Sequence, residues 1–342
     1  MYKRLIFALA ALTYSSSTPC FASDSGFDIT VETIKVSENV RFQAISLSGH
    51  NIWLSGTESA IFRSHNNGHD WHKIQPPSLN VNQQFRDIEV DGSKISLMAA
   101  GLGSESQLHF SNDAGQHWQL VQQGSHPSTF YDCVTQGKHN PAELWLYGDS
   151  VEGKLFALKS DDFGQTWQEL VLGIDAEKGE GGFAASGTCI SSDKDGSIAI
   201  GTGNNQNPRI LFKAPDKPWQ TITTPFSGGE ASGIFSLQIQ QNTVYAFGGG
   251  LNAKDKPAEA YTYDFVTKQW SSLPEVPLHG AIYGSAITDD FIFISNPEGI
   301  AALSRASQTW QLISVTDTWA LACNQSICWG AGADGHIVKI HL

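Results

Sequence analysis

The sequence predicts an all-β protein, a seven-bladed β-propeller of four-stranded antiparallel sheets. The first observation is a pattern, S-x-D-x-G-x-x-W, that ends at Trp71, Trp118 and Trp167 and has Asn66 in place of the aspartate in its first copy. These tryptophans lie 47 and 49 residues apart, a period typical of propeller blades. The second is that short β-branched or aromatic segments, bounded by Gly, Asn, Asp and Ser, surround every copy. The third is that helical periodicity of useful length is absent outside the N-terminal segment.

Each repeat has the same order of elements. An apolar strand is followed by a turn, a second strand with small residues, a third strand, the tryptophan turn and a fourth strand. In the first repeat we expect these strands over residues 42–47, 52–55, 60–63 and 71–74. Weaker copies end at Trp219, Trp270 and Trp310, at intervals of 52, 51 and 40 residues. The copy that ends at Trp270 also resembles a kelch blade, because it contains Ala246-Phe247-Gly248-Gly249-Gly250.

A seventh repeat is expected over residues 318–321, 327–330 and 337–340, and it lacks a fourth strand. The segment 29–34 alternates in the way a strand requires and would supply it. Such a closure joins the two ends of the chain and leaves no exposed sheet edge in the ring. Because composition shows no linker, we predict one domain over residues 27–342.

The residues of the three tryptophan turns are predicted to be structural. Short polar side chains bond to nearby backbone groups, the glycine permits a positive φ angle, and the tryptophan packs between blades. Asp113 and Asp162 therefore belong to turns rather than to acid catalysis. The residues to which we assign this structural role are Ser64, Gly68, Trp71, Ser111, Asp113, Gly115, Trp118, Ser160, Asp162, Gly164 and Trp167.

The first 22 residues are predicted to be an export signal. Lys3 and Arg4 precede the apolar stretch 5–12, and Cys20-Phe21-Ala22 provides a small-x-small cleavage site. The apolar stretch is too short to span a bilayer, and no later segment is suited to do so. We therefore expect cleavage near Ala22 and a soluble periplasmic or secreted protein, without an integral membrane segment.

The full chain has a formal net charge of −13, and removal of the signal leaves 19 basic and 34 acidic residues, a net charge of −15. This balance disfavours nucleic acid and anionic lipid surfaces as partners. Its simplest role is to keep an exported protein in solution. No cofactor and no metal site are predicted, because no cysteine spacing resembles a zinc site and no phosphate-binding loop precedes a helix. A monomer is expected.

Four cysteines remain after cleavage, an even number that permits disulfides in an exported protein. Cys323 and Cys328 flank a predicted hairpin tip, which makes a bridge between the two strands feasible. Cys133 and Cys189 begin equivalent strands of neighbouring repeats, and the sequence leaves open whether they pair.

Propellers usually carry function where the innermost strands and the loops before them surround the central channel. Polar residues at these positions would converge on one mouth, and taken together they predict a binding surface. Taken singly, each also has a structural explanation, such as an ion pair or a solvated turn. The candidates are Arg86, Asp87, Asp132, Asp149, Glu180, Ser186, Glu230 and Ser232, with His279 and Tyr283 beside them.

No catalytic residues are predicted with this surface. Sialidases share the turns but hold a substrate carboxylate with three arginines, which suit that planar group. After cleavage this chain has five arginines, and Arg86 alone lies at a position that leads into the channel. Ser186 lacks the context of a nucleophile elbow.

The chain resembles the aspartate-box propellers of the photosystem II stability/assembly factor family, and is most similar to exported bacterial relatives of that family. The three turns carry the resemblance, together with the segments 85–88, 130–133, 179–189 and 229–237. The resemblance implies an assembly scaffold that meets its partner through an arginine-rich patch. This chain departs from that pattern in its few arginines and its acidic balance.

Two functions follow from the sequence. The first is a non-catalytic, exported binding or assembly-scaffold protein that holds a protein or an envelope glycan at the channel mouth. The alternative is a carbohydrate-active hydrolase or lyase that uses Asp87, Asp132, Glu180 or Glu230 as acid and base, since paired carboxylates in different environments can do such work. A third possibility is a purely structural role inside a larger complex.

Overall fold

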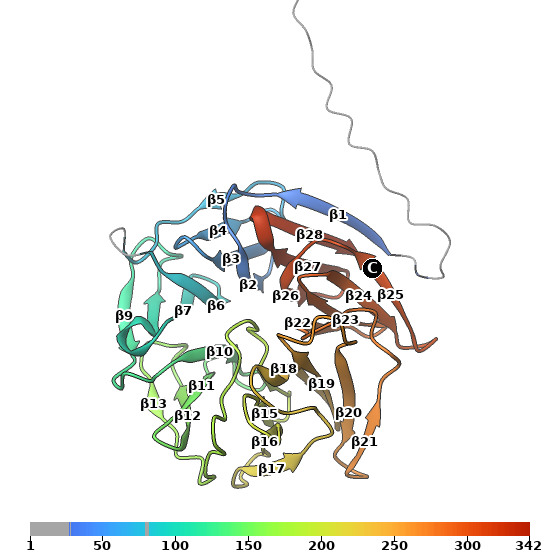
Figure 1. Ribbon diagram of the computed structural model, residues 1–342. Helices are drawn as coiled ribbons and strands as arrows, with labels where there is room; N and C mark the ends of the chain where they lie inside the picture. Colours follow the sequence, from blue (N-terminus) through green and yellow to red (C-terminus); the bar gives the residue numbers. More distant parts are fainter. Residues whose placement is uncertain (1–26, 28, 79–81) are drawn as a thin grey trace, which may run out of the picture.

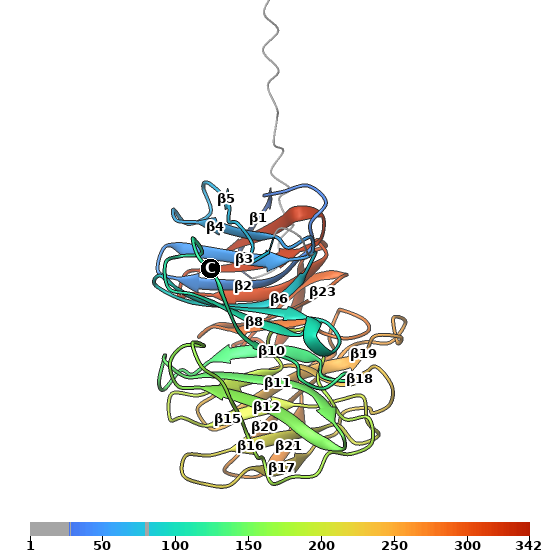
Figure 2. The same cartoon turned by 90° about the vertical axis from the view of Figure 1, so that its left-hand side faces the viewer.

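The computed structural model describes residues 27, 29–78 and 82–342, and shows seven four-stranded antiparallel sheets arranged around a common centre (Figure 1). Figure 2 views the same ring from its side. The predicted seven-bladed, all-β propeller is therefore confirmed. The predicted signal peptide, residues 1–22, lies outside the described residues.

The first three blades carry the complete tryptophan turns. Blade I consists of β2 (Phe42–Ser48), β3 (Asn51–Gly56), β4 (Ile61–Ser64) and β5 (His72–Lys73). Blade II consists of β6 (Gln84–Asp91), β7 (Lys94–Ala100), β8 (Gln107–Ser111) and β9 (Gln119–Gln123). Blade III consists of β10 (Tyr131–Gln136), β11 (Leu144–Val151), β12 (Lys154–Ser160) and β13 (Gln168–Glu169).

The next three blades follow the same order. Blade IV consists of β14 (Ile190–Ser192), β15 (Ile198–Gly201), β16 (Arg209–Lys213) and β17 (Gln220–Thr223). Blade V consists of β18 (Ser232–Gln240), β19 (Thr243–Gly250), β20 (Glu259–Asp264) and β21 (Gln269–Ser272). Blade VI consists of β22 (Gly284–Ile287), β23 (Phe291–Asn296), β24 (Gly299–Ser304) and β25 (Thr309–Ser314).

Blade VII combines the two ends of the chain. It consists of β26 (Thr318–Cys323), β27 (Ile327–Gly332) and β28 (His336–His341), and its outer strand is β1 (Thr30–Lys35). β1 pairs antiparallel with β28, from Thr30 opposite His341 to Lys35 opposite His336. The innermost strands contact one another all the way round, including β26 against β2. The predicted closure by an N-terminal strand is confirmed (Figure 1).

The core is divided into clusters that lie between blades. One cluster joins Trp53 and Ile61 of blade I to Phe85 and Leu97 of blade II, and Trp118 packs against it. The partly buried tryptophans of the other five repeats pack in the same way, each against a cluster shared with the preceding blade; they are Trp71, Trp167, Trp219, Trp270 and Trp310. The cluster between blades VI and VII has no such tryptophan among its described residues and uses Phe27 and Leu342 instead.

The tryptophan turns close through one recurring set of hydrogen bonds. In blade II, Ser111 Oγ accepts from the Gly115 amide at 2.9 Å and donates to Asp113 Oδ1 at 2.9 Å. The same Asp113 oxygen accepts from the His117 amide at 2.9 Å. Ser160 and Asp162 form the equivalent bonds in blade III. The serine and aspartate thus replace ladder bonds that the turn cannot make.

The glycine of each turn lies against the preceding blade. Gly115 has a φ of +81°, and a Cβ there would lie 2.7 Å from Ile74 Cγ2. A Cβ added to Gly68 would likewise collide with the Trp329 ring. The turn therefore needs glycine for its backbone angle and also for its close contact with the neighbouring sheet.

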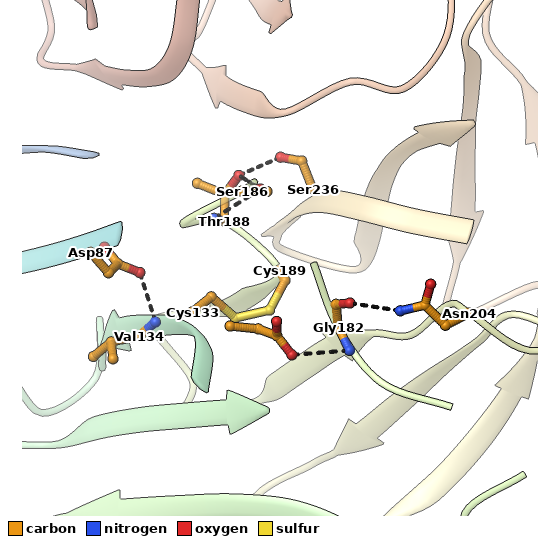
Figure 3. The surroundings of a disulfide bond; sticks show 10 residues. Asp87, Cys133, Val134, Gly182, Ser186, Thr188, Cys189, Asn204 and Ser236 are labelled. Atoms are coloured by element: carbon orange, nitrogen blue, oxygen red, sulfur yellow. Dashed lines mark hydrogen bonds between the residues drawn. A yellow bond between two sulfur atoms is a disulfide. The ribbon is translucent and has the colours of Figure 1, made fainter. Parts of the chain in front are cut away.

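Both expected disulfides are present. Cys133–Cys189 joins blades III and IV next to the channel, with Cα atoms 6.0 Å apart (Figure 3). Cys323–Cys328 joins β26 to β27 at directly opposed positions. Disulfides are compatible with an oxidising compartment outside the cytosol. Among the described residues, no helix has the length and apolar character needed to cross a membrane.

The contact of Gly115 with blade I leads to a first prediction. Gly115→Ala should lower the free energy of unfolding by about 1–3 kcal/mol more than Gly92→Ala, because overpacking adds to the cost of the backbone angle. Gly92 is a matched control: its φ is +60°, and no atom lies within 4 Å of an added Cβ. Denaturant unfolding of both variants measures the difference, and equal losses would contradict this account of the turn.

Candidate functional site

Several inner strands carry a β-bulge close to their first residue, which lies at one end of the central channel. The register shifts between Phe85 and Asp87 in β6 and between Tyr131 and Cys133 in β10, which leaves Arg86 and Asp132 as the extra residues. Bulges re-aim a side chain. Equivalent shifts in three other inner strands single out Gln43, Phe235 and Trp319.

Aromatic rings form a continuous arc over blades IV to VII. Phe183 stacks on Phe235 with ring centroids 3.6 Å apart, and Phe235 lies 6.1 Å from Tyr283. Tyr283 meets Trp319 edge to face at 4.9 Å. Phe183 and Phe235 are buried, whereas Tyr283 and Trp319 are half-buried and present part of their surface at the channel mouth.

Two arginines extend this arc into blades I and II. The guanidinium of the exposed Arg41 lies 4.8 Å from the Trp319 ring centroid, and that of the half-buried Arg86 lies 5.8 Å from it. Arg86 is held by bonds to Ala184 O at 2.9 Å and to Gln84 Oε1 at 2.7 Å. Burial, and next the charge of Arg41, lowers the pKa of Arg86. In the part of the chain that the structure describes, the Arg41 guanidinium forms no hydrogen bond and no ion pair. We call Arg41, Arg86, Tyr283 and Trp319 the mouth cluster.

The segment 170–189 between β13 and β14, here called the mouth loop, covers the rest of the mouth. Its Gly181 exchanges backbone hydrogen bonds with Gly203 at 3.1 and 2.9 Å. The Gly182 amide donates to Asp132 Oδ2 at 3.1 Å. The Gly182 carbonyl oxygen accepts from Asn204 Nδ2 at 3.1 Å (Figure 3). The loop is therefore fastened to blades II, III and IV.

Asp132 and Asp149 lie directly beneath the mouth loop. A Cβ on Gly181 would lie 1.9 Å from Asp149 Oδ1, and one on Gly182 would lie 2.7 Å from Asp132 Oδ2, so glycine permits the close approach. Burial raises the pKa of Asp149 to about 6. Burial, and next the charge of Asp149, raises the pKa of Asp132 well above its usual range. The pair thus retains a proton at a pH at which an exposed aspartate has lost it.

Asp87 connects two inner strands. Its Oδ2 accepts from the Val134 amide of β10 at 2.7 Å (Figure 3). Its Oδ1 accepts from the Ile88 amide at 2.9 Å. Glu89 makes a parallel bond to the Gln136 amide at 3.0 Å. Burial raises the pKa of Asp87 and raises that of Glu89 to about 7. Both residues line a cavity of about 90 Å³ inside the ring.

Glu180 and Ser186 are buried within the mouth loop. Glu180 forms a bidentate ion pair with Arg209, with Oε1 at 2.8 Å from Nε and Oε2 at 2.7 Å from Nη2. The Ser186 hydroxyl lies 3.1 Å from Thr188 Oγ1, which bonds to Ser236 of blade V (Figure 3). These polar groups fasten the loop rather than face solvent.

The remaining candidates lie on the rim. Glu230 is exposed, and the half-buried Ser232 donates to the Glu230 carbonyl at 3.4 Å. His279 is also exposed, with Nδ1 3.2 Å from Glu298 Oε2. Of the polar residues that the sequence brings to the mouth, Arg86, Asp149, Glu230, Ser232 and His279 keep some exposure, whereas Asp87, Asp132, Glu180 and Ser186 are enclosed.

Sequence reasoning missed Arg41 and Trp319, as well as the stacking of Phe183 on Phe235. A signal for Trp319 and Phe235 was present, because they occupy the same position of the repeat as Arg86 and Asp132. Aromatic residues at that position look like core residues unless the bulge is recognised. Over residues 27, 29–78 and 82–342, no group of three or more His, Cys, Asp or Glu side chains is arranged to hold a metal ion.

The raised pKa of Asp149 leads to a second prediction. Because the folded-state pKa of about 6 lies above the ordinary value of 3.8, the associated stability is present below about pH 4 and is lost as the pH rises through 6. Asp149→Asn keeps the size and shape of the side chain and removes its charge. The melting temperature of the variant minus that of the wild type should therefore increase between pH 4.5 and pH 7.5. The increase corresponds to about 1–2 kcal/mol in the free energy of unfolding.

Glu230→Gln is the control for this prediction, since it removes one negative charge from the exposed rim of the same mouth. Melting temperatures at both pH values, measured for the wild type and the two variants, separate burial from net charge. The same pH response in Asp149→Asn and Glu230→Gln would show that burial of Asp149 has no special effect.

Comparisons with known proteins find solved structures of similar fold. No protein-family model matches this chain, and no curated protein matches it. Among solved structures, YCF48 bound to D1 peptide is similar over 91% of this chain and 95% of its own, with 12% identity and a TM-score of 0.66. YCF48 from Cyanidioschyzon merolae is similar over 91% and 98%, with 14% identity and a TM-score of 0.64.

A lyase shares the same architecture. Inactive virginiamycin B lyase from Staphylococcus aureus with quinupristin is similar over 92% of this chain and 100% of its own, with 11% identity and a TM-score of 0.68.

YCF48 is a photosystem II assembly factor, so the predicted likeness to that family extends to the seven-bladed fold. At these identities the comparisons establish a shared fold, which carries both binding proteins and enzymes.

Proposed function

We propose that this protein is a non-catalytic binding or scaffold protein that holds a segment of another protein at the channel mouth. The observation that carries the proposal is the mouth cluster, in which Arg41 and Arg86 lie over Trp319 and Tyr283 continues the surface. Arginine, tryptophan and tyrosine are the residues most enriched at the energetic centres of protein interfaces.

The hydrogen bonding and burial of the carboxylates support the same proposal. Asp87, Asp132 and Glu180 each accept backbone or arginine hydrogen bonds and are nearly enclosed. Groups held in this way stabilise the mouth, whereas Arg41 has donors available to a partner. The peptide bound to the similar propeller YCF48 is a further reason to consider a peptide ligand here.

We also propose that residues 1–22 form a signal peptide that is removed near Ala22, and that the protein acts in the periplasm or outside the cell as a monomeric domain over residues 27–342. The two disulfides support this location, because such bonds persist in oxidising compartments.

Selection from a displayed library of random peptides tests the binding proposal. Peptides selected on the wild type should bind Arg41→Ala at least tenfold more weakly, because the variant removes the exposed cation at the mouth. Lys73→Ala is the control, since it removes one exposed cation from the outer strand β5. Fluorescence polarisation measures the affinities. Failure to select any peptide, or equal peptide affinity of Arg41→Ala and Lys73→Ala, would contradict the proposal that the mouth cluster binds a peptide.

A carbohydrate-active hydrolase or lyase is the second candidate function. The observation that favours it is the proton-retaining pair Asp132 and Asp149 at the mouth, because catalytic carboxyls commonly have raised pKa values. In this case the wild type would release new reducing ends, from xyloglucan as a hydrolase or from a uronate polysaccharide as a lyase, and Asp149→Asn would lose that activity. A reducing-end assay decides between the two, since the binding proposal expects no turnover by either protein.

A further inference from the structure

A second candidate binding site lies far from the channel mouth, between blades IV and V. It is a groove of about 640 Å³, within the size range of ligand pockets. Its lining includes the whole of β17, the β14–β15 turn at Asp195 and Ser197, and the β18–β19 turn at Gln241 and Asn242. These turns are at the opposite ends of the inner strands from the mouth cluster.

The turn beside the groove differs at one position from the equivalent turn of the next blade. In blades V and VI the turn between the third and fourth strands is closed by the same bond, from Lys268 N to Asp264 O at 2.8 Å and from Gln308 N to Ser304 O at 2.9 Å. The next residue after the third strand is Phe265 in blade V, and Arg305 occupies the same position in blade VI.

Arg305 occupies the space between blades V and VI. Its Nη1 donates to Gln240 Oε1 of blade V at 3.0 Å, and its Nη2 donates to Tyr245 Oη at 3.3 Å. Phe265 instead packs against the aromatic rings of blades IV and V. Its ring is tilted against Phe212, with centroids 4.3 Å apart, and meets Tyr263 edge to face, with centroids 5.5 Å apart. The space between blades IV and V therefore remains open.

The floor of the groove is aromatic. Phe212 and Tyr263 are buried, while Phe265 and Trp270 are half-buried and expose part of their rings. The indole of Trp270 is held in place by a bond from Nε1 to Thr223 O at 2.8 Å. Rigid ring faces carry negative electrostatic potential and attract the weakly positive C–H groups of a ligand.

The walls are polar and nearly neutral. One aspartate, Asp195, and one lysine, Lys268, face the groove, and the other polar side chains are amides and hydroxyls. Amides and hydroxyls both donate and accept hydrogen bonds, as a ligand rich in hydroxyl groups requires. The walls are formed by Ser197, Gln220, Thr221, Thr223, Gln241 and Asn242.

We propose that this groove binds a neutral oligosaccharide. The ligand must offer both C–H faces for the rings and hydroxyls for the walls, and a sugar ring has both. The balanced charge of the lining, in a chain of net charge −13, argues against an anionic glycan. This site is independent of the proposed peptide site, because the two share no residue.

Calorimetric titration of the intact protein with cellohexaose, xylohexaose and N-acetylchitohexaose tests the proposal. At least one should bind. Phe265→Arg should weaken that binding at least tenfold, because an arginine at this position should fill the groove as Arg305 fills the space between blades V and VI. Gln220→Ala should also weaken it, whereas Gln168→Ala should not. Gln168 is the matched control, an exposed glutamine at the start of β13 as Gln220 is at the start of β17.

Three results would overturn the proposal. The first is that none of the three oligosaccharides binds to wild-type protein. The second is that binding is unchanged in both Phe265→Arg and Gln220→Ala. The third is that hexagalacturonate or an extended heptapeptide of alternating threonine and valine, titrated in parallel, binds the groove more tightly than the neutral sugars. Arg41→Ala should bind the sugars as the wild type does, which separates this result from that of the peptide experiment.

Discussion

The structure depends above all on the packing of each blade against the next. A four-stranded sheet of this size cannot bury both faces by itself, so its apolar side chains are shared with its two neighbours. The clusters show this directly, since each combines residues of adjacent sheets. A partly buried indole such as Trp118 adds a large area to the contact. Only a closed ring gives every blade two neighbours. β1 completes the sheet of blade VII, and blade VII packs against blade I.

Closure also determines what the polar residues near the axis do. Inner strands of neighbouring blades meet there with backbone amides that have no partner in their own sheet, and a buried amide without a partner is costly. Asp87 satisfies the Val134 amide, and Asp132 satisfies Gly182. Residues that look catalytic in the sequence therefore have a structural task. In the mouth cluster, by contrast, cations and rings lie together and keep part of their surface exposed.

Differences between blades matter more for recognition than the repeat itself. Blades I to III close with the long serine–aspartate turn, whose glycine lies against the preceding sheet. Blades V and VI use a shorter turn. Its first residue, Arg305, reaches into the adjoining space in blade VI, whereas the space beside Phe265 in blade V is open. A repeated scaffold thus offers the same position several times, and each copy can be specialised without disturbing the others.

The blade number, the closing strand and the structural role of the tryptophan turns could be predicted from the sequence, because they follow from local patterns that recur at a fixed spacing. The Cys323–Cys328 pairing followed from a predicted hairpin, whereas the repeat positions of Cys133 and Cys189 made their pairing feasible and the structure established it. The composition of the site could not be predicted in the same way. Whether Asp132 or Trp319 meets solvent depends on a bulge and on a loop that arrives from another blade, and the sequence contains neither the register nor the contact. Local chemistry thus determined the architecture, whereas burial at the axis was decided by segments far apart in the chain, which only the folded ring brings together.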